Sequence, residues 1–159
     1  MKLIDAHTHL NTGDLYPQRE EYLSQFVQAG GAGLINSWAN EEYNTRGLKI
    51  AQSAKLKAQS CVVKSTIGYH PDCCNDGEIS EENLQQKILD LKKIYQEHKE
   101  YIVAIGECGI DTYYPGSEDS LDLQKKLFAA QCELARELWL PVMVHIRKDF
   151  TTAIEILQQ

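Results

Sequence analysis

Two histidines near the start of the chain, His7 and His9, are spaced as metal ligands at the end of a strand can be. They stand in the stretch Ile-Asp-Ala-His-Thr-His-Leu at positions 4–10. Alternate side chains of a β-strand point to the same face, so Asp5, His7 and His9 share one face. Histidine is the commonest metal ligand, and two neighbouring imidazoles can hold one divalent cation. The alternative is two unrelated surface histidines in a turn.

Further polar side chains follow three later apolar runs, at the point where each run ends. His70 follows one run, Glu107 the next and His145 the last, with Asp111 and Arg147 beside them. The carboxyl ends of parallel strands carry the active site of a barrel and the ligand crevice of an open sheet. We therefore expect these side chains to gather with the first two histidines.

This set of side chains suits two divalent metal ions. His7, His9 and His145 supply nitrogen atoms, and the two carboxylate oxygens of Glu107 can bridge two ions. A pair of ions about 3.5–4 Å apart suits phosphodiester hydrolysis, because it stabilises both the attacking and the leaving oxygen. Nitrogen-rich sites suit Zn²⁺, whereas phosphoryl chemistry often uses Mg²⁺ or Mn²⁺, so all three metals stay open.

Two residues are candidates for contacts with a substrate. The planar guanidinium of Arg147 matches a phosphate or a carboxylate, and a surface ion pair is the alternative. His70 precedes Pro71, which favours an extended turn. Its imidazole can donate a hydrogen bond to a substrate.

The elements that must position these residues alternate between short apolar strands and amphipathic helices. This β-α alternation, repeated five times, predicts a parallel α/β sheet in one domain. We expect strands at 3–7, 32–37, 61–67, 101–105 and 141–144, and helices at 20–29, 40–56, 80–99, 120–138 and from 149 onward. One face of the helix at 120–138 carries Gln124, Leu127, Phe128, Gln131, Leu134, Ala135 and Leu138.

The composition is that of a globular protein. The chain has 159 residues, of which 43% are hydrophobic and 25% charged, enough for one core. It shows neither a membrane-spanning run nor an apolar leader, so we expect a cytoplasmic protein without a membrane partner. A net charge of −7 argues against a basic nucleic-acid-binding surface, although bound cations can meet a phosphate.

The five cysteines predict neither a disulfide framework nor a structural zinc module. Their number is odd and no C-x-x-C occurs, so we expect reduced thiols. The pair Cys73-Cys74 falls in a predicted loop, where soft-metal binding or redox sensing is the alternative to ordinary loop thiols.

Four motifs, in this order, resemble the TatD family of metal-dependent hydrolases. They are Asp-Ala-His-Thr-His-Leu at 5–10, Gly-Tyr-His-Pro at 68–71, Ile-Gly-Glu-Cys-Gly-Ile-Asp at 105–111 and Leu-Pro-Val-Met-Val-His-Ile-Arg at 140–147. The family has a TIM-barrel fold related to that of the amidohydrolases, and many members are deoxyribonucleases. The resemblance spans the whole chain, whereas His-x-His alone would not separate this family from other amidohydrolases.

The resemblance implies a role for each candidate residue. His7, His9, Glu107 and His145 would bind the metal ions, with Glu107 as the bridge. Glu107, His70 and Arg147 would be the catalytic residues, acting on DNA or another phosphodiester. A hydrolase of small amide, ester or lactone substrates is the alternative, because the same ligands serve both reactions.

The resemblance also implies an incomplete barrel, with about five of eight βα units. Residues 1–159 would form the N-terminal part of a TatD-like (β/α)8 barrel. The family's later ligands, a histidine on strand six and an aspartate on strand eight, find no counterpart after His145 and Asp149. Open sheet edges predict self-association or pairing with a complementary chain. A catalytically inactive chain that acts only as an assembly partner is the third hypothesis.

Overall fold

A five-stranded parallel sheet positions every candidate site residue. The computed structural model describes residues 2–37, 39–57 and 61–159. The strands pair in the order of the sequence, and all four pairings are parallel. They are β1 (Leu3–Thr8), β2 (Gly31–Asn36), β3 (Val62–Ile67), β4 (Ile102–Asp111) and β5 (Val142–Arg147). The predicted parallel α/β architecture is confirmed.

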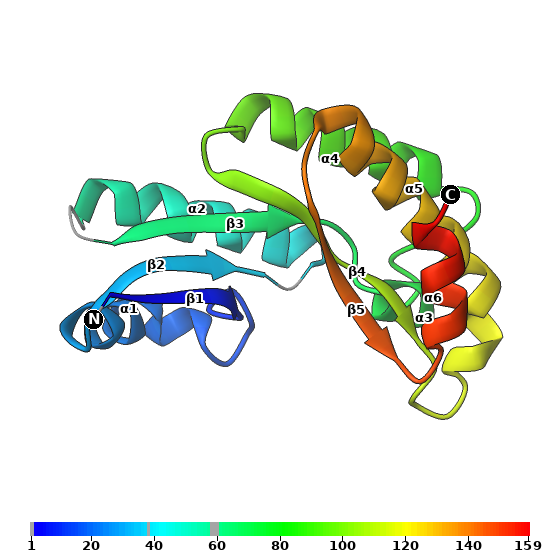
Figure 1. The fold of residues 1–159 in the computed structure, drawn as a ribbon, viewed down its shortest axis with the longest axis horizontal. Coiled ribbons are helices and arrows are strands. Elements are labelled where there is room, and N and C mark those ends of the chain that lie inside the picture. Colours follow the sequence, from blue (N-terminus) through cyan, green and yellow to red (C-terminus); the bar gives the residue numbers. More distant parts are fainter. Residues whose placement is uncertain (1, 38, 58–60) are drawn as a thin grey trace.

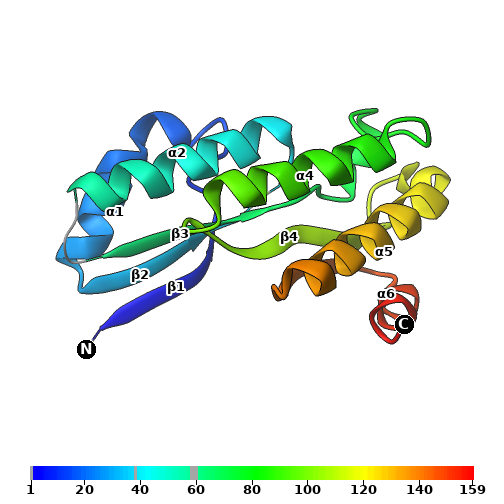
Figure 2. The same ribbon diagram turned by 90° about the horizontal axis from the view of Figure 1, so that it is seen from above.

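Helices connect successive strands. They are α1 (Arg19–Gln28), α2 (Glu41–Lys57), α3 (Asp72–Asn75), α4 (Leu84–His98), α5 (Leu121–Leu138) and α6 (Phe150–Leu157), with short 3-10 turns η1 (Tyr16–Gln18) and η2 (Ser117–Ser120). In Figure 2, α1, α2 and α4 lie on one side of the strands. Among the described residues, none of the helices combines the length and apolar character needed to cross a membrane.

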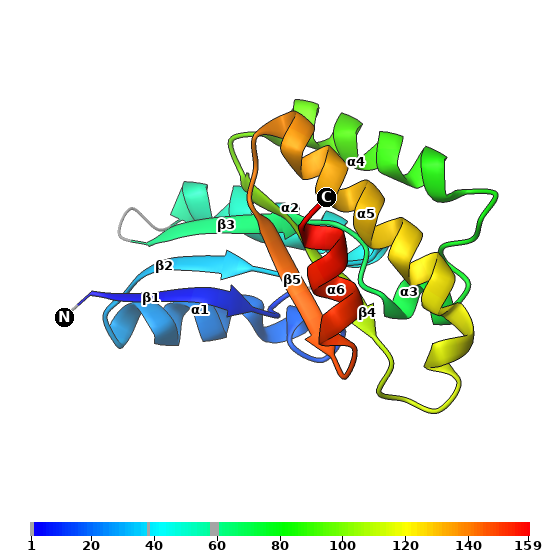
Figure 3. The same cartoon turned by 45° about the vertical axis from the view of Figure 1, so that its right-hand side comes forward.

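The sheet is curled as one wall of a barrel is. In Figure 1, β1, β2 and β3 run nearly side by side, whereas β4 and β5 cross them steeply. The strand order places β1 and β5 at the two margins of the sheet, and the turned view of Figure 3 shows α6 beside β5. A parallel sheet twists because each strand has a right-handed twist, and a twisted sheet with helices on one face is the start of a closed barrel.

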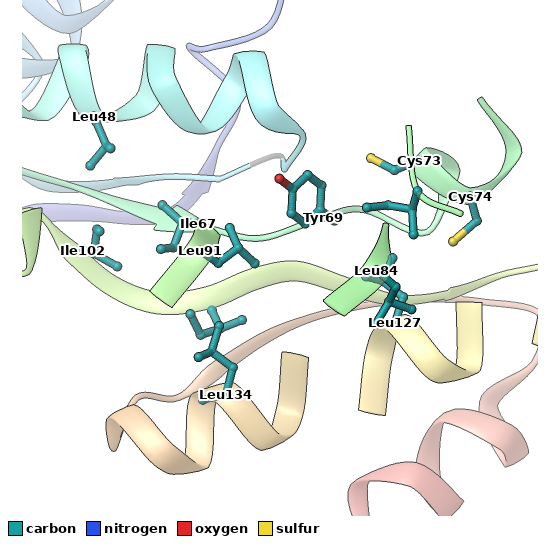
Figure 4. Close-up of a cluster of buried hydrophobic side chains, with 13 residues drawn as sticks. Leu48, Ile67, Tyr69, Cys73, Cys74, Leu84, Leu91, Ile102, Leu127 and Leu134 are labelled. Carbon is teal, nitrogen blue, oxygen red and sulfur yellow. The ribbon is translucent and has the colours of Figure 1, made fainter. Parts of the chain in front are cut away.

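The main core lies between the central strands and the helices that cover them. Leu91 of α4, Ile67 of β3, Ile105 of β4 and Leu127 of α5 are all at most 1% exposed and belong to one cluster (Figure 4). Six of the seven residues of the predicted α5 stripe are buried, namely Gln124, Leu127, Phe128, Gln131, Leu134 and Ala135, and Leu138 is partly buried against the same core. A smaller cluster of Cys108, Ile110, Phe128 and Ala153 joins α5 and α6 to β4.

The structure corrects several predicted boundaries. β4 does not end at Ile105 but continues to Asp111, because its last residues pair with β5 as far as Arg147. The same pairing extends β5 through His145. The helix expected from Ser80 begins at Leu84, since the backbone N–H of Ser80 donates to Asn83 Oδ1 in a preceding turn.

The segment at 72–79 is not the plain loop that the sequence predicted. Its first residues form α3, which buries Cys73 and Cys74. Burial raises the pKa of both thiols, and a buried protonated thiol is a poor nucleophile and a poor metal ligand. The structure therefore favours ordinary structural thiols over a redox or soft-metal site.

Candidate active site at the carboxyl ends of the strands

Glu107 is the centre of the candidate site. Its side chain comes from the middle of β4 and is almost fully buried, with the residue 5% exposed. Its Oε1 lies 3.2 Å from His145 Nδ1 on β5, and its Oε2 lies 3.4 Å from His7 Nε2 on β1. One carboxylate thus faces imidazoles from both margins of the sheet.

Glycines on either side of Glu107 let β4 and β5 approach closely. Gly109 has a φ of 152°, and a Cβ placed on it would lie 1.9 Å from the carbonyl oxygen of His145. Gly106 has a φ of 142°, and its Cβ would lie 2.4 Å from the carbonyl oxygen of Met143. A side chain at either position would push β5 away. The spacing Gly-Glu-Cys-Gly therefore holds Glu107 next to His145.

Asp111 extends the cluster toward Arg147. Asp111 Oδ2 lies 2.9 Å from His145 Nε2 and 3.9 Å from Arg147 Nη1. Its other oxygen, Oδ1, accepts a hydrogen bond of 2.8 Å from the backbone N–H of Tyr113. One carboxylate therefore fixes the ring of His145 and the start of the loop that follows β4.

His70 follows the end of β3 and lies beside the same cluster of side chains. Its ring centre is 4.3 Å from that of His145, in an edge-to-face arrangement. Its Nδ1 lies 3.2 Å from Asp72 Oδ2, so a carboxylate orients this imidazole as well. His9, the residue that follows β1, completes the group, with its ring centre 4.8 Å from that of His7.

Three buried amide side chains hold the strand ends that carry these residues. Gln124 on α5 accepts from the backbone N–H of Asp111 and donates to its carbonyl oxygen, at 2.9 and 3.1 Å. Gln131 makes the same pair of bonds with Tyr69, at 2.7 and 2.9 Å. Asn44 on α2 does so with Gly68, at 3.0 and 2.8 Å. Helix-borne amides therefore satisfy backbone groups beyond the last ladder bonds of β3 and at the end of β4.

The electrostatics favour an ionised carboxylate beside imidazoles. Burial tends to raise the pKa of Glu107, but the hydrogen bond with His145 and the adjacent imidazoles outweigh it and keep this pKa below its ordinary value. Burial lowers the pKa of His9 and so favours the neutral ring. Burial also disfavours protonated His145, yet the hydrogen bonds with Glu107 and Asp111 outweigh it and raise its pKa. A divalent cation would therefore compete with a proton at His145.

The described residues contain two groups that fit a metal ion, and Glu107 belongs to both. One is His7, His9 and Glu107, and the other is His70, Glu107 and His145, with ligand atoms within 4.8 Å of one another in each group. Buried Glu107 Oε2 makes no hydrogen bond within the described part of the chain. A buried, ionised oxygen that faces imidazole nitrogens is the donor set that divalent metals take.

Comparison with known proteins identifies the family. The family model described as TatD related DNase matches residues 4–159. The chain belongs to this family. Sequence relatives include an uncharacterized metal-dependent hydrolase of Mycoplasma pneumoniae, 30% identical over all of this chain and 56% of the relative. Deoxyribonuclease TATDN3 of Homo sapiens is 28% identical over 99% of the chain and 56% of its own length.

Solved structures agree with the TatD fold. The TatD homologue YJJV of Escherichia coli superposes with a TM-score of 0.78 at 24% identity, over 98% of this chain and 55% of that chain. A TatD family hydrolase of Entamoeba histolytica gives a TM-score of 0.83 at 18% identity, over 99% and 54%. The chain spans about half the length of the relatives that it matches, which agrees with the predicted partial barrel.

Every predicted site residue lies in this one region. His7, His9, Glu107 and His145, the predicted metal ligands, meet around the Glu107 carboxylate. His70, which we predicted on the substrate side, lies as close to the ligand set as those four. Sequence reasoning assigned no contact to Asp72, Asn44 or the two glutamines of α5. An amide in an otherwise apolar helical stripe was the available signal for Gln124 and Gln131.

Proposed function

We propose that this chain provides a large part of the active site of a metal-dependent phosphodiesterase that acts on DNA. The observation that carries the proposal is the single Glu107 carboxylate shared between two imidazole groups, with Arg147 at the rim. A shared carboxylate suits a pair of metal ions, and paired ions suit phosphodiester hydrolysis. Relatives named deoxyribonuclease and 3'-5' ssDNA/RNA exonuclease support this substrate class.

Each residue has a stated task in the proposal. His7, His9, Glu107 and His145 would hold two ions of Mg²⁺, Mn²⁺ or Zn²⁺, and these ions would supply the positive charge that polarises the phosphodiester. His70 and Arg147 bind and orient the phosphate, and Asp111 keeps the His145 ring in place. The guanidinium can form two parallel bonds with phosphate oxygens, which a lysine cannot do.

The proposal is tested by replacing Glu107 with glutamine. We expect metal binding measured by calorimetry to weaken by at least tenfold, because the amide carries no charge and only one acceptor oxygen. Hydrolysis of single-stranded DNA with Mg²⁺, Mn²⁺ or Zn²⁺ should fall to background in the same variant. Glu118→Gln is the matched control, since Glu118 is exposed in η2. Unchanged hydrolysis in the Glu107 variant would contradict the proposal.

A substrate panel separates the alternatives. Turnover of small esters, lactones or amides without DNA hydrolysis would favour the amidohydrolase-like alternative. Metal binding without turnover of any substrate would favour the hypothesis of an inactive chain that acts in assembly.

A further inference from the structure

Two neighbouring tyrosines on the loop after β4 are exposed at the rim of the candidate site. Tyr113 and Tyr114 are 52% and 53% exposed, and their ring centres lie 5.2 Å apart with the rings nearly perpendicular. Their exposed faces are not needed for the core, because neither residue belongs to a buried cluster.

Two cationic side chains contact these rings: Arg147 at the end of β5 and Lys148, the next residue. The guanidinium carbon of Arg147 lies 4.8 Å from the ring centre of Tyr113 and 5.5 Å from that of Tyr114. Lys148 Nζ lies 5.3 Å from the Tyr113 ring and donates to the Tyr113 carbonyl oxygen at 3.5 Å. Such contacts are attractive because the ring face is negative. We call Tyr113, Tyr114, Arg147 and Lys148 the tyrosine platform.

Asp111 links the platform to the candidate metal ligands. One of its oxygens lies 2.9 Å from His145 Nε2, and the other accepts from the backbone N–H of Tyr113. Arg147 contacts both the platform ring of Tyr113 and this carboxylate, because its Nη1 is 3.9 Å from Asp111 Oδ2. A ligand on the tyrosine rings would therefore lie beside any phosphate held at the metal ligands.

The chemistry of the platform fits one flat aromatic group joined to an anion. Exposed aromatic faces stack on nucleobases whatever their sequence, and the adjacent cations pair with the phosphate backbone. In a duplex the base faces are already stacked on one another, so the free faces belong to unpaired bases. A small amide or lactone would use neither feature.

We propose that an unpaired base of the nucleic acid stacks on the face of one ring of the Tyr113–Tyr114 pair and meets the edge of the other, while Arg147 and Lys148 hold the phosphate next to it. The inference rests on the proposed function, because it names the part of the substrate that this rim recognises. It assigns Tyr113 and Tyr114 to substrate selection rather than to hydrolysis.

The test compares binding of two oligomers of equal length and charge. Fluorescence anisotropy in EDTA, which prevents metal-dependent hydrolysis, would measure the affinity for a labelled single-stranded thymidine hexamer and for the same hexamer with abasic sugars. We expect the base-containing oligomer to bind roughly five- to hundredfold more tightly, the range for stacking one base. Tyr113→Leu and Tyr114→Leu should reduce this ratio, and the double variant should bring it close to one.

Two kinds of control make the result specific. Tyr113→Phe and Tyr114→Phe keep the rings and should keep the ratio, whereas Trp139→Leu removes an aromatic ring that is 94% exposed at the opposite end of β5. Arg147→Gln should weaken binding of both oligomers and reduce the salt dependence of binding. Circular dichroism would verify that each variant is folded.

The outcomes distinguish the platform from the hydrolase proposal. Equal affinity for the two oligomers, no binding of either, or an unchanged ratio in the double leucine variant would overturn the platform. If hydrolysis nevertheless depends on Glu107, the proposed function still stands. If base-dependent binding requires the tyrosines but DNA is never hydrolysed, the platform stands and the proposed function fails.

Discussion

β4 and β1 both supply ligands to the candidate site, but from very different surroundings. β4 is buried along almost its whole length, because it pairs with β3 and β5 and is covered by α5. β1 is exposed from Leu3 to His7 and pairs, among the described strands, with β2 alone. Packing therefore fixes Glu107 on β4, whereas the side chain of His7 on β1 is 42% exposed. Position in the sheet decides how firmly each ligand is held.

The largest expected difference between the two strands is in stability. Ile105→Ala on β4 removes a side chain that is 0% exposed, and such a deletion typically costs about 2–5 kcal/mol in the free energy of unfolding. Ile4→Ala on β1 is the matched change at a residue that is 74% exposed, and it should stay within about 0.5 kcal/mol. Urea unfolding of both variants measures the contrast. Equal losses would show that β1 is packed as β4 is.

A second prediction concerns the amides that support the central strand ends. Gln131→Met keeps the side-chain length but leaves the backbone N–H and carbonyl of Tyr69 without their amide partner. Each buried group left unpaired costs about 1–3 kcal/mol. Gln85→Met on the exposed face of α4 is the control and should change stability by less than about 0.5 kcal/mol. Denaturant midpoints compare the two, and equal midpoints would count against a structural role for Gln131.

The smallest effect on unfolding, but a visible one on assembly, is expected at the sheet margins. Phe150, Ile154 and Leu157 form an exposed apolar stripe on α6, with 58%, 49% and 46% exposure. Exposed apolar stripes and unpaired strands favour association. We expect light scattering to give a mass above that of a monomer, and Ile154→Lys to lower it. Leu89→Lys, at a residue 57% exposed on α4, is the control. A wild-type monomer with a cooperative melt would refute this expectation.

Much of the architecture could be predicted from local patterns of residue type in the sequence. The stripe of α5 and the apolar strands are visible in the sequence because burial on one face imposes a period on the residue types. The clustering of His7, Glu107 and His145 followed from the rule that parallel strands end at one edge. These parts of the prediction depend on geometry that every parallel sheet shares.

The remaining features depended on contacts between distant segments. The sequence could not extend β4 to Asp111, because only pairing with β5 makes residues 106–111 a strand. The place of His70 beside His145 depends on the curl of the sheet, which brings the ends of β3 and β5 together. The amide bonds of Gln131 to Tyr69 join residues 62 positions apart, a distance at which periodicity carries no information.

The amides of Asn44, Gln124 and Gln131 connect the carboxyl ends of β3 and β4 to the helices α2 and α5 that cover the sheet. Backbone N–H groups at the ends of parallel strands ordinarily become exposed to solvent at a low free-energy cost, because no further ladder bond restrains them. Here the N–H groups of Gly68, Tyr69 and Asp111 donate to side chains of α2 and α5. Water can reach them only when a helix moves off the sheet. Local opening at the carboxyl ends of β3 and β4 and undocking of α2 and α5 are therefore one event. The arrangement of the ligands lasts as long as these helices stay packed on the sheet.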